Sequence, residues 1–107
     1  MRAILIDPIK REVTEVQIHH ALEGDTLGDL QKAVGGYIEL AHRFDNGDDL
    51  FVNEEGLYKY SIFFDIGAHS PFAGSGIIVG HNSAGNTTPA KSSIEDIKSR
   101  IRWQVRP

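Results

Sequence analysis

Residues 26–41 read TLGDLQKAVGGYIELA and predict a helix that is followed directly by a strand. Thr26, with Asp29 three positions later, approximates the capping box that begins many helices, with Asp in place of the preferred Glu. Apolar side chains then recur at helical spacing, so one stripe of the helix would face a sheet. The stripe consists of Leu27, Leu30 and Val34. We therefore expect an amphipathic helix over residues 26–34.

The glycine pair Gly35 and Gly36 is expected to end this helix. Glycine enters the left-handed conformation of a helix C-terminus without a Cβ penalty, and it also lets a helix approach a sheet closely. Residues 37–41, which follow at once, have the composition of a strand. Gly35 and Gly36 are therefore interpreted as structural turn residues that need no ligand to explain them.

The N-terminal residues predict a β-hairpin. Residues 3–6 form an unbroken apolar run closed by Asp7 and Pro8, as in a strand that is buried on both faces. Residues 14–18 alternate between apolar and polar side chains, as in a strand with one solvated face. We expect the first strand to lie in the centre of the sheet and the second to lie nearer its edge.

Turn signals divide the middle of the chain into further strands. An Asn-Gly pair within residues 45–48 favours a tight hairpin turn, and a returning strand is expected over residues 50–52. Asn53 and Gly56 suit the positions of a second structural turn. The β-prone residues 57–64 are then predicted to form one strand.

The last third of the chain is predicted to contain one strand, two loops and one helix. The segments are a loop at 67–76, a buried strand at 77–79 and a flexible polar loop at 81–92. Ser92 and Glu95 form a capping box before apolar residues at helical spacing. We therefore predict a helix that runs from residue 94 to Trp103.

The length and composition indicate a single α+β domain. A chain of 107 residues with 40% hydrophobic residues can bury one core, and no repeat or linker divides residues 1–107. Hairpins combined with two helices favour a five- or six-stranded, mostly antiparallel or mixed sheet with both helices packed on it. One face of that sheet is expected to stay open to solvent or to a partner.

The composition also excludes several classes of function. The absence of cysteine rules out disulfides, thiolate nucleophiles and thiolate metal sites. No apolar run approaches the ~20 residues of a membrane span and no secretory signal is present, so a cytoplasmic location is expected. The net charge of -4, with a basic excess only near the C-terminus, argues against binding to duplex nucleic acid. The five histidines lack metal-ligand spacing, and we expect neither a metal site nor a cofactor.

Three short motifs carry a resemblance to a known family. They are LQKAVGGYIE at residues 30–39, NEEGL at residues 53–57 and IIVG at residues 77–80. With these motifs the chain resembles the domain-of-unknown-function family DUF3846, which comprises small proteins of bacteria, bacteriophages and other mobile elements. The resemblance covers residues 2–60 well and weakens beyond them. It implies a cytoplasmic accessory protein with no established reaction, and it supplies no catalytic residues.

Two groups of residues are candidates for binding. The adjacent carboxylates of Glu54 and Glu55 could meet a cation or a basic partner. The loops at 67–76 and 80–92 carry small neutral donors and acceptors that suit a nucleotide or the backbone of a partner. The candidates in these loops are His69, Ser70, Ser75, His81, Asn82 and Asn86. A functionally silent insert is the alternative interpretation of the same loops.

Three functions are compatible with these residues, in decreasing order of preference. The first is a non-enzymatic interaction protein of phage or mobile-element origin that binds and modulates a host protein, for example by inhibiting a bacterial defence system. The second is a protein that binds or sequesters a small nucleotide-like ligand. The third is a small hydrolase using Asp65 and His69, although the sequence contains no convincing catalytic constellation. Surplus aromatic residues would most simply be covered in a symmetric homodimer.

Overall fold

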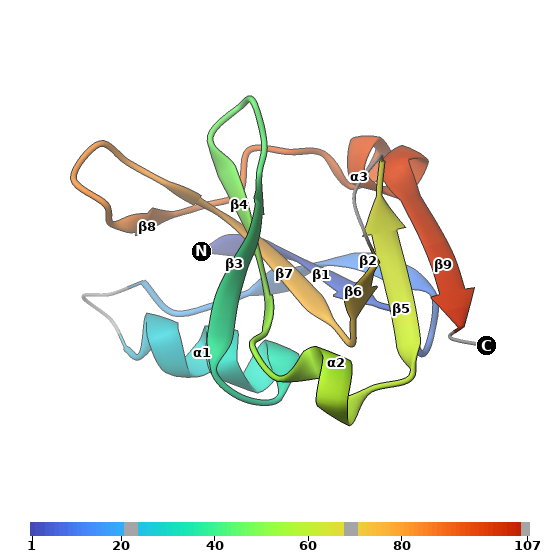
Figure 1. Cartoon of the computed structure of the whole chain (residues 1–107). Coiled ribbons are helices and arrows are strands. Elements are labelled where there is room, and N and C mark those ends of the chain that lie inside the picture. The colour runs from blue at the N-terminus through green and yellow to red at the C-terminus, as the bar shows by residue number, and fades with distance from the viewer. Residues whose placement is uncertain (21–23, 68–70, 106–107) are drawn as a thin grey trace.

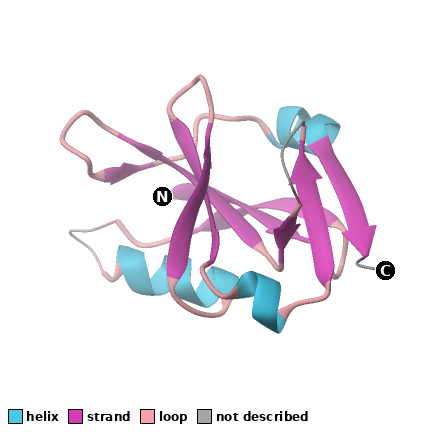
Figure 2. Ribbon diagram, viewed as in Figure 1, coloured by secondary structure: helices cyan, strands magenta, loops and turns pink. Residues whose placement is uncertain are grey.

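The computed structural model describes residues 1–20, 24–67 and 71–105 (Figure 1). Strands dominate these residues, and the helices lie at the periphery (Figure 2). In chain order the elements are β1 (Arg2–Asp7), β2 (Glu12–Gln17), α1 (Thr26–Val34), β3 (Ile38–Arg43), β4 (Asp48–Asn53), α2 (Gly56–Lys59), β5 (Ile62–Ile66), β6 (Phe72–Ala73), β7 (Gly76–His81), β8 (Thr87–Thr88), α3 (Ile94–Arg100) and β9 (Ile101–Val105).

The main sheet has six antiparallel strands in the order β2-β1-β7-β4-β3, with β8 paired to the end of β7. The hairpins β1-β2 and β3-β4 form as the sequence predicts. Strand β7 joins them, because it pairs with β1 on one side and with β4 on the other. The predicted positions of the first two strands are also confirmed, since β1 is interior and β2 is an edge strand.

Both faces of this sheet are covered. Along β7, Ile77 and Val79 belong to one buried cluster together with Leu30 and Val34 of α1, whereas Ile78 belongs to a second cluster on the opposite face. The expectation of one open face is therefore wrong. A strand whose two alternating sets of side chains are both apolar needs cover on both sides.

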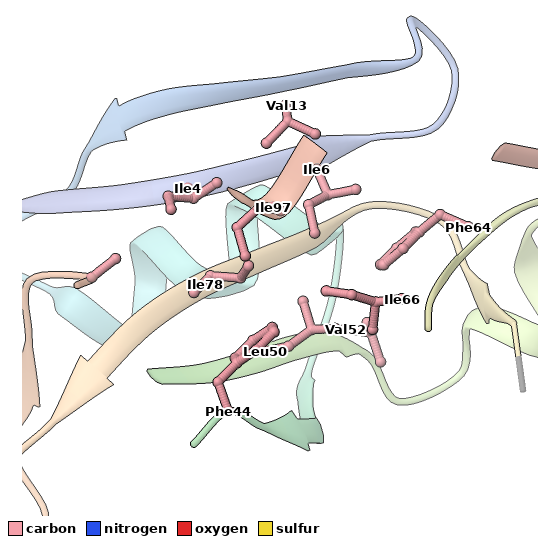
Figure 3. Close-up of a cluster of buried hydrophobic side chains, with 11 residues drawn as sticks. Ile4, Ile6, Val13, Phe44, Leu50, Val52, Phe64, Ile66, Ile78 and Ile97 are labelled. Atoms are coloured by element: carbon pink, nitrogen blue, oxygen red, sulfur yellow. The ribbon is translucent and has the colours of Figure 1, made fainter. Parts of the chain in front are cut away.

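The second face is covered by a three-stranded sheet, in the order β6-β5-β9, and by α3. Side chains of both sheets and of α3 meet there in one buried cluster (Figure 3). Phe64 of β5 and Ile97 of α3 are fully buried in the same cluster as Ile78 and Leu50 of the main sheet. The molecule is thus a single compact α+β domain, as predicted, and the described residues include two helices of seven or more residues. No helix in the described part of the chain is long and apolar enough to cross a membrane.

The predicted strand over residues 57–64 is wrong in its first half. Residues 56–59 form the short helix α2, and β5 begins only at Ile62. The propensity of a segment for strands depends on packing against a neighbouring strand. Here the pairing with β9 starts at Ile62 and the pairing with β6 at Phe63, so residues 56–59 form a helical turn instead.

The predicted helix from residue 94 to Trp103 is too long. Helix α3 ends at Arg100, and the residues after it form β9, which pairs antiparallel with β5. Ile101 fits both patterns, because it continues the helical spacing of Ile94 and Ile97 and also alternates with Trp103 as in a strand. Pairing with β5 decides between the two patterns.

The predicted loops at 67–76 and 81–92 each contain a short strand, β6 and β8 respectively. The segment after β8 is held by Asp48, which is fully buried in β4. The Asp48 carboxylate accepts hydrogen bonds from the backbone N–H of Lys91 at 3.0 Å and of Ser92 at 2.8 Å, and from the Ser92 hydroxyl at 2.7 Å.

Both helix caps lie one residue from their predicted positions. Because the Ser92 hydroxyl binds Asp48, Ser93 caps α3 and accepts from the N–H of Asp96 at 3.1 Å. At α1 the cap is Asp25, whose carboxylate accepts from the N–H of Gly28 at 2.8 Å.

Candidate functional site

The end of α1 is the framework of the candidate site. Gly35 has φ of 80°, in the left-handed region, and its N–H and that of Gly36 both donate to the carbonyl of Gln31, at 2.8 and 3.0 Å. These two hydrogen bonds, with glycine in the left-handed conformation, satisfy a carbonyl of the last helical turn and end the helix sharply. The chain therefore turns directly from α1 into β3.

Asn53, at the end of β4, joins this turn to the next one. Its side chain is buried, and its amide donates to the carbonyl of Val34 at 3.1 Å, while its Oδ1 accepts from the N–H of Glu55 at 2.8 Å. A Cβ atom at Gly36 would come within 2.8 Å of the Asn53 amide nitrogen. Gly36 and Asn53 are thus required together, because the Asn53 side chain fills the space that a side chain at position 36 would occupy.

The backbone also connects the two motif segments. The N–H of Glu54 donates to the carbonyl of Tyr37 at 3.0 Å. Gly56 allows α2 to lie against β6, since a Cβ there would be 2.7 Å from the carbonyl oxygen of Ala73. Two segments that are well separated in sequence therefore build one continuous surface.

This surface exposes large apolar side chains beside carboxylates. Tyr37, Leu57 and Tyr58 are 68%, 60% and 93% exposed, respectively. Glu54 and Glu55, which shortly precede Leu57 and Tyr58 in the chain, are also exposed. We call these five residues the motif surface. Since a monomer gains nothing from leaving such side chains in water, their grouping is typical of an interaction site.

Two hollows flank Glu54 on the motif surface. One has a volume of about 500 Å³ and is lined by Tyr37, Glu54, Glu55 and Lys59, together with the end of α1. The other has a volume of about 110 Å³ and is lined by Glu54, Leu57 and residues of β6. The motif surface therefore has two depressions that could receive protruding side chains of a partner.

The motif surface carries the carboxylates of Glu54 and Glu55, and Lys32 and Lys59 line the larger hollow beside them. Lys59 lies 3.8 Å from Glu55, but both side chains are about half exposed, and such an ion pair contributes little stability. Glu39 lines the smaller hollow and adds a third carboxylate to those of Glu54 and Glu55. Basic residues of a partner would complement the smaller hollow, whose lining includes Glu39 and Glu54 and no basic residue.

Among the remaining predicted binding residues that the structure describes, Ser75 lies apart from His81, Asn82 and Asn86. Ser75 precedes β7 and His81 ends it, so their Cα atoms are separated by the length of the strand, about 20 Å at 3.3 Å per residue. Asn82 and Asn86 form the tip of the β7-β8 hairpin, where Oδ1 of Asn82 accepts from the backbone N–H groups of Ala84 and Asn86 at 3.0 Å. His69 and Ser70 lie outside the described residues.

Asp65, the carboxylate of the hydrolase hypothesis, is a buried residue of β5. Its Oδ2 accepts a hydrogen bond from the side-chain amide of Gln104 on β9. Its expected partner, His69, lies outside the described residues. Within those residues no group of three or more His, Cys, Asp or Glu side chains could hold a metal ion.

The sequence interpretation missed two features of the surface. It expected some surplus aromatic residues, Tyr58 among the candidates, to stay unburied, but it did not predict that Tyr37 and Leu57 would be exposed. It also missed a cluster of Arg43, Asp49 and His81, although Arg43 and Asp49 flank the Asn-Gly turn at the spacing of a cross-strand pair. Hairpin register was the signal that could have revealed that pair.

The chain is thus a small α+β protein whose distinctive motif residues shape an exposed surface. It belongs to the DUF3846 family, whose model, described as a domain of unknown function, matches residues 1–102. The match extends through β5, β7 and α3, beyond the residues 2–60 over which the sequence motifs resemble the family most closely. No curated protein and no solved structure matches the chain.

Proposed function

We propose that this protein is a non-enzymatic interaction protein that binds and modulates a host protein through the motif surface. The observation that supports this most directly is the exposure of Leu57 and Tyr58 on α2. Burying a leucine side chain contributes about 1.5–3 kcal/mol. Tyrosine is among the residues that most often dominate the binding energy of protein interfaces.

The proposed partner carries basic residues beside an apolar patch. Leu57 and Tyr58 would supply the apolar contact, and Glu54 and Glu39 would meet basic side chains at its rim. Rim charges of this kind mainly accelerate and orient the encounter. The association rate should therefore fall as salt concentration rises.

We propose the cytoplasm of a bacterial host as the setting, and a phage or another mobile element as the source. Inhibition of a bacterial defence system is the concrete form of this proposal. It is tested by expressing the protein in cells that carry a defence system and measuring phage plating. An unchanged plating efficiency across a panel of such systems would argue against this form.

The binding proposal is tested by affinity capture from host cells with three versions of the protein. The wild type and a Leu27→Ser control should each recover the same stoichiometric partner, because Leu27 is exposed near the start of α1, whereas the motif surface adjoins the end of that helix. A Leu57→Ser, Tyr58→Ser double variant should recover about tenfold less of it. Equal recovery by all three versions would show that the motif surface is not the interface.

Self-association through the motif surface is the alternative to binding a host protein. A symmetric homodimer would cover the motif surface with a second copy of itself. Sedimentation analysis of the wild type and the double variant distinguishes the two cases. If only the wild type is a dimer, the surface serves self-association in place of host binding.

A further inference from the structure

The outer edge of strand β3 lies next to the motif surface. In the main sheet β3 is the terminal strand, and no further strand of the described chain pairs with its outer edge. The strand begins at Ile38, directly after Tyr37 of the motif surface, and its residues Glu39 and Leu40 are exposed. A strand in this position can accept an additional strand from outside the molecule, because one row of its backbone groups has no partner strand.

The pairing of β3 with β4 fixes which backbone groups point outward. The N–H of Glu54 donates to the carbonyl of Tyr37, so these two residues form a hydrogen-bonded pair just before the registered pairs of β3 and β4. In antiparallel strands, hydrogen-bonded pairs alternate with pairs that exchange no hydrogen bonds. Glu39 therefore bonds to β4, whereas the N–H and C=O groups of Ile38 and Leu40 point away from β4.

The two faces of this edge differ in chemistry. Leu40 is the register partner of Phe51, which packs on the same buried cluster as α1, so Leu40 lies on the α1 face, where it is 43% exposed. Glu39 is the register partner of Val52, which belongs to the cluster on the opposite face. An extended segment beside β3 would thus meet an apolar side chain on one face and a carboxylate on the other, at alternate positions.

The smaller hollow of the motif surface lies on the Glu39 face. Its volume of about 110 Å³ is below the ~300–1,000 Å³ of small-molecule sites, so it suits a single side chain. Its lining combines the carboxylates of Glu39 and Glu54 with the apolar side chains of Leu57 and Phe72. A lysine or arginine has an apolar stem and a cationic head, which match these two kinds of lining. Charge complementarity therefore favours a basic residue of a partner in this hollow.

We propose that an extended segment of the partner protein adds to β3 as an antiparallel strand and places a lysine or arginine side chain in the hollow lined by Glu39 and Glu54. The N–H and C=O groups of Ile38 and Leu40 bond to the backbone of the segment, and the side chains at alternate positions provide specificity. The β-bulge after Leu40 limits regular pairing to the first half of β3, so the added strand is short. This inference rests on the proposed function, because it states how the same partner is held.

The test uses the whole protein and the synthetic peptide acetyl-Thr-Val-Lys-Val-Lys-Val-Thr-amide. The valines of this peptide favour an extended conformation, and its lysines then share one face. Amide hydrogen exchange is followed by NMR with and without saturating peptide. The amides of Ile38 and Leu40 should exchange at least about tenfold more slowly in the complex, whereas the amide of Glu39 should be protected in both states.

Two N-methylated peptides test whether the contact is a strand pairing. In the antiparallel arrangement the valines lie opposite Ile38 and Leu40, and the lysines lie opposite Glu39. Methylation of the valine nitrogens removes the donors that face β3 and should abolish binding, whereas methylation of the lysine nitrogens changes groups that point to solvent and should preserve it. Equal binding of the two methylated peptides would overturn the proposal.

A charge reversal tests the hollow. Glu39→Lys should weaken the binding of the lysine peptide about tenfold or more, and should bind a peptide with glutamate in place of both lysines more tightly than the wild type does. The matched control Glu12→Lys reverses an exposed charge on β2, the opposite edge strand of the main sheet, and should change neither affinity. The proposal is overturned if the lysine peptide does not bind saturably, or if Glu39→Lys binds it as tightly as the wild type.

Two further outcomes distinguish this proposal from the proposed function and from self-association. If the Leu57→Ser, Tyr58→Ser variant loses the host partner while Glu39→Lys captures it as well as the wild type, strand addition is overturned and the proposed function stands. If the amides of Ile38 and Leu40 become protected in the free protein as its concentration rises, β3 pairs with a second copy of the chain, which overturns the assignment of this edge to a host segment.

Discussion

Arg11 has a backbone conformation that is unfavourable for its residue type. It lies in the β1-β2 turn with φ of 54°, the only positive φ at a non-glycine residue in the described part of the chain. The turn is fixed from its other side by Asp7, whose Oδ1 accepts from the N–H groups of Ile9 and Lys10 at 3.0 and 3.2 Å. The left-handed conformation costs an ordinary residue about 1–2 kcal/mol.

Replacing this residue with glycine should stabilise the protein. Arg11→Gly removes the steric cost, and the larger conformational freedom of glycine in the unfolded chain offsets part of the gain, leaving about 0.5 kcal/mol. Chemical denaturation measures the change in the free energy of unfolding. The matched control Lys10→Gly, at the neighbouring position with ordinary φ, should lose about 0.5–1 kcal/mol. A loss of stability in both variants would contradict this explanation.

At the scale of elements, the segment after β2 is tied to α1 by one carboxylate. Asp29 of α1 accepts from the backbone N–H of His19 at 2.7 Å, and its Oδ2 lies 2.8 Å from the His19 ring. The backbone N–H of His19, and then its side chain, lower the pKa of Asp29 below the ordinary value for aspartate. The contact therefore favours the charged carboxylate in the folded state.

This shift predicts an acid-sensitive contribution to stability. Because the folded-state pKa of Asp29 is lowered, its contribution is present above about pH 4 and is lost as the pH falls through the folded-state value. Between about pH 5 and pH 2, the free energy of unfolding of the wild type should fall more than that of Asp29→Asn. Asp45→Asn, an exposed change in the β3-β4 turn, serves as the control and should follow the wild type. Parallel curves for all three proteins would show that the contact does not stabilise the fold.

Elements whose signals lie within one segment were predictable from the sequence. Helix α1 has the predicted bounds, and both hairpins form, because caps, turn residues and apolar spacing all act locally. Helix α2 and strand β9 were not predictable, because both depend on contacts that are distant in sequence. The start of β5 at Ile62 leaves the preceding residues to α2, and pairing with β5 makes the residues after α3 a strand. The candidate site divides in the same way. Glu54 and Glu55 were recognised from the sequence, whereas the contacts of Asp49 with Arg43 and His81 depend on the register of three strands.

At the scale of the whole molecule, the domain consists of three layers, and the six-stranded sheet is the middle one. Helix α1 covers one face, and the second sheet with α3 covers the other. Ile77 and Ile78 are both fully buried, but they belong to different clusters on opposite faces. A substitution at one of these two adjacent residues therefore perturbs one core, and a substitution at the other perturbs the second core.

The two cores are expected to unfold together. Ile77→Ala and Ile78→Ala should each cost about 2–5 kcal/mol, because each leaves a cavity in a packed cluster. Both variants should still unfold in one transition when followed by circular dichroism and by the fluorescence of Trp103. Leu57→Ala, an exposed change, should cost less than about 0.5 kcal/mol. Separate transitions in either core variant would show that the layers are independent.

The central place of β7 also constrains the order in which the chain can assemble. The hairpins β1-β2 and β3-β4 are local and do not pair with each other, so nothing joins them in the sheet until residues 76–81 are available. During synthesis at the ribosome, the first two-thirds of the polypeptide would therefore emerge as separate, unjoined hairpins. Closing such distant pairings is slow compared with forming local ones. Truncation before residue 76 should consequently yield two unconnected hairpins and no smaller domain.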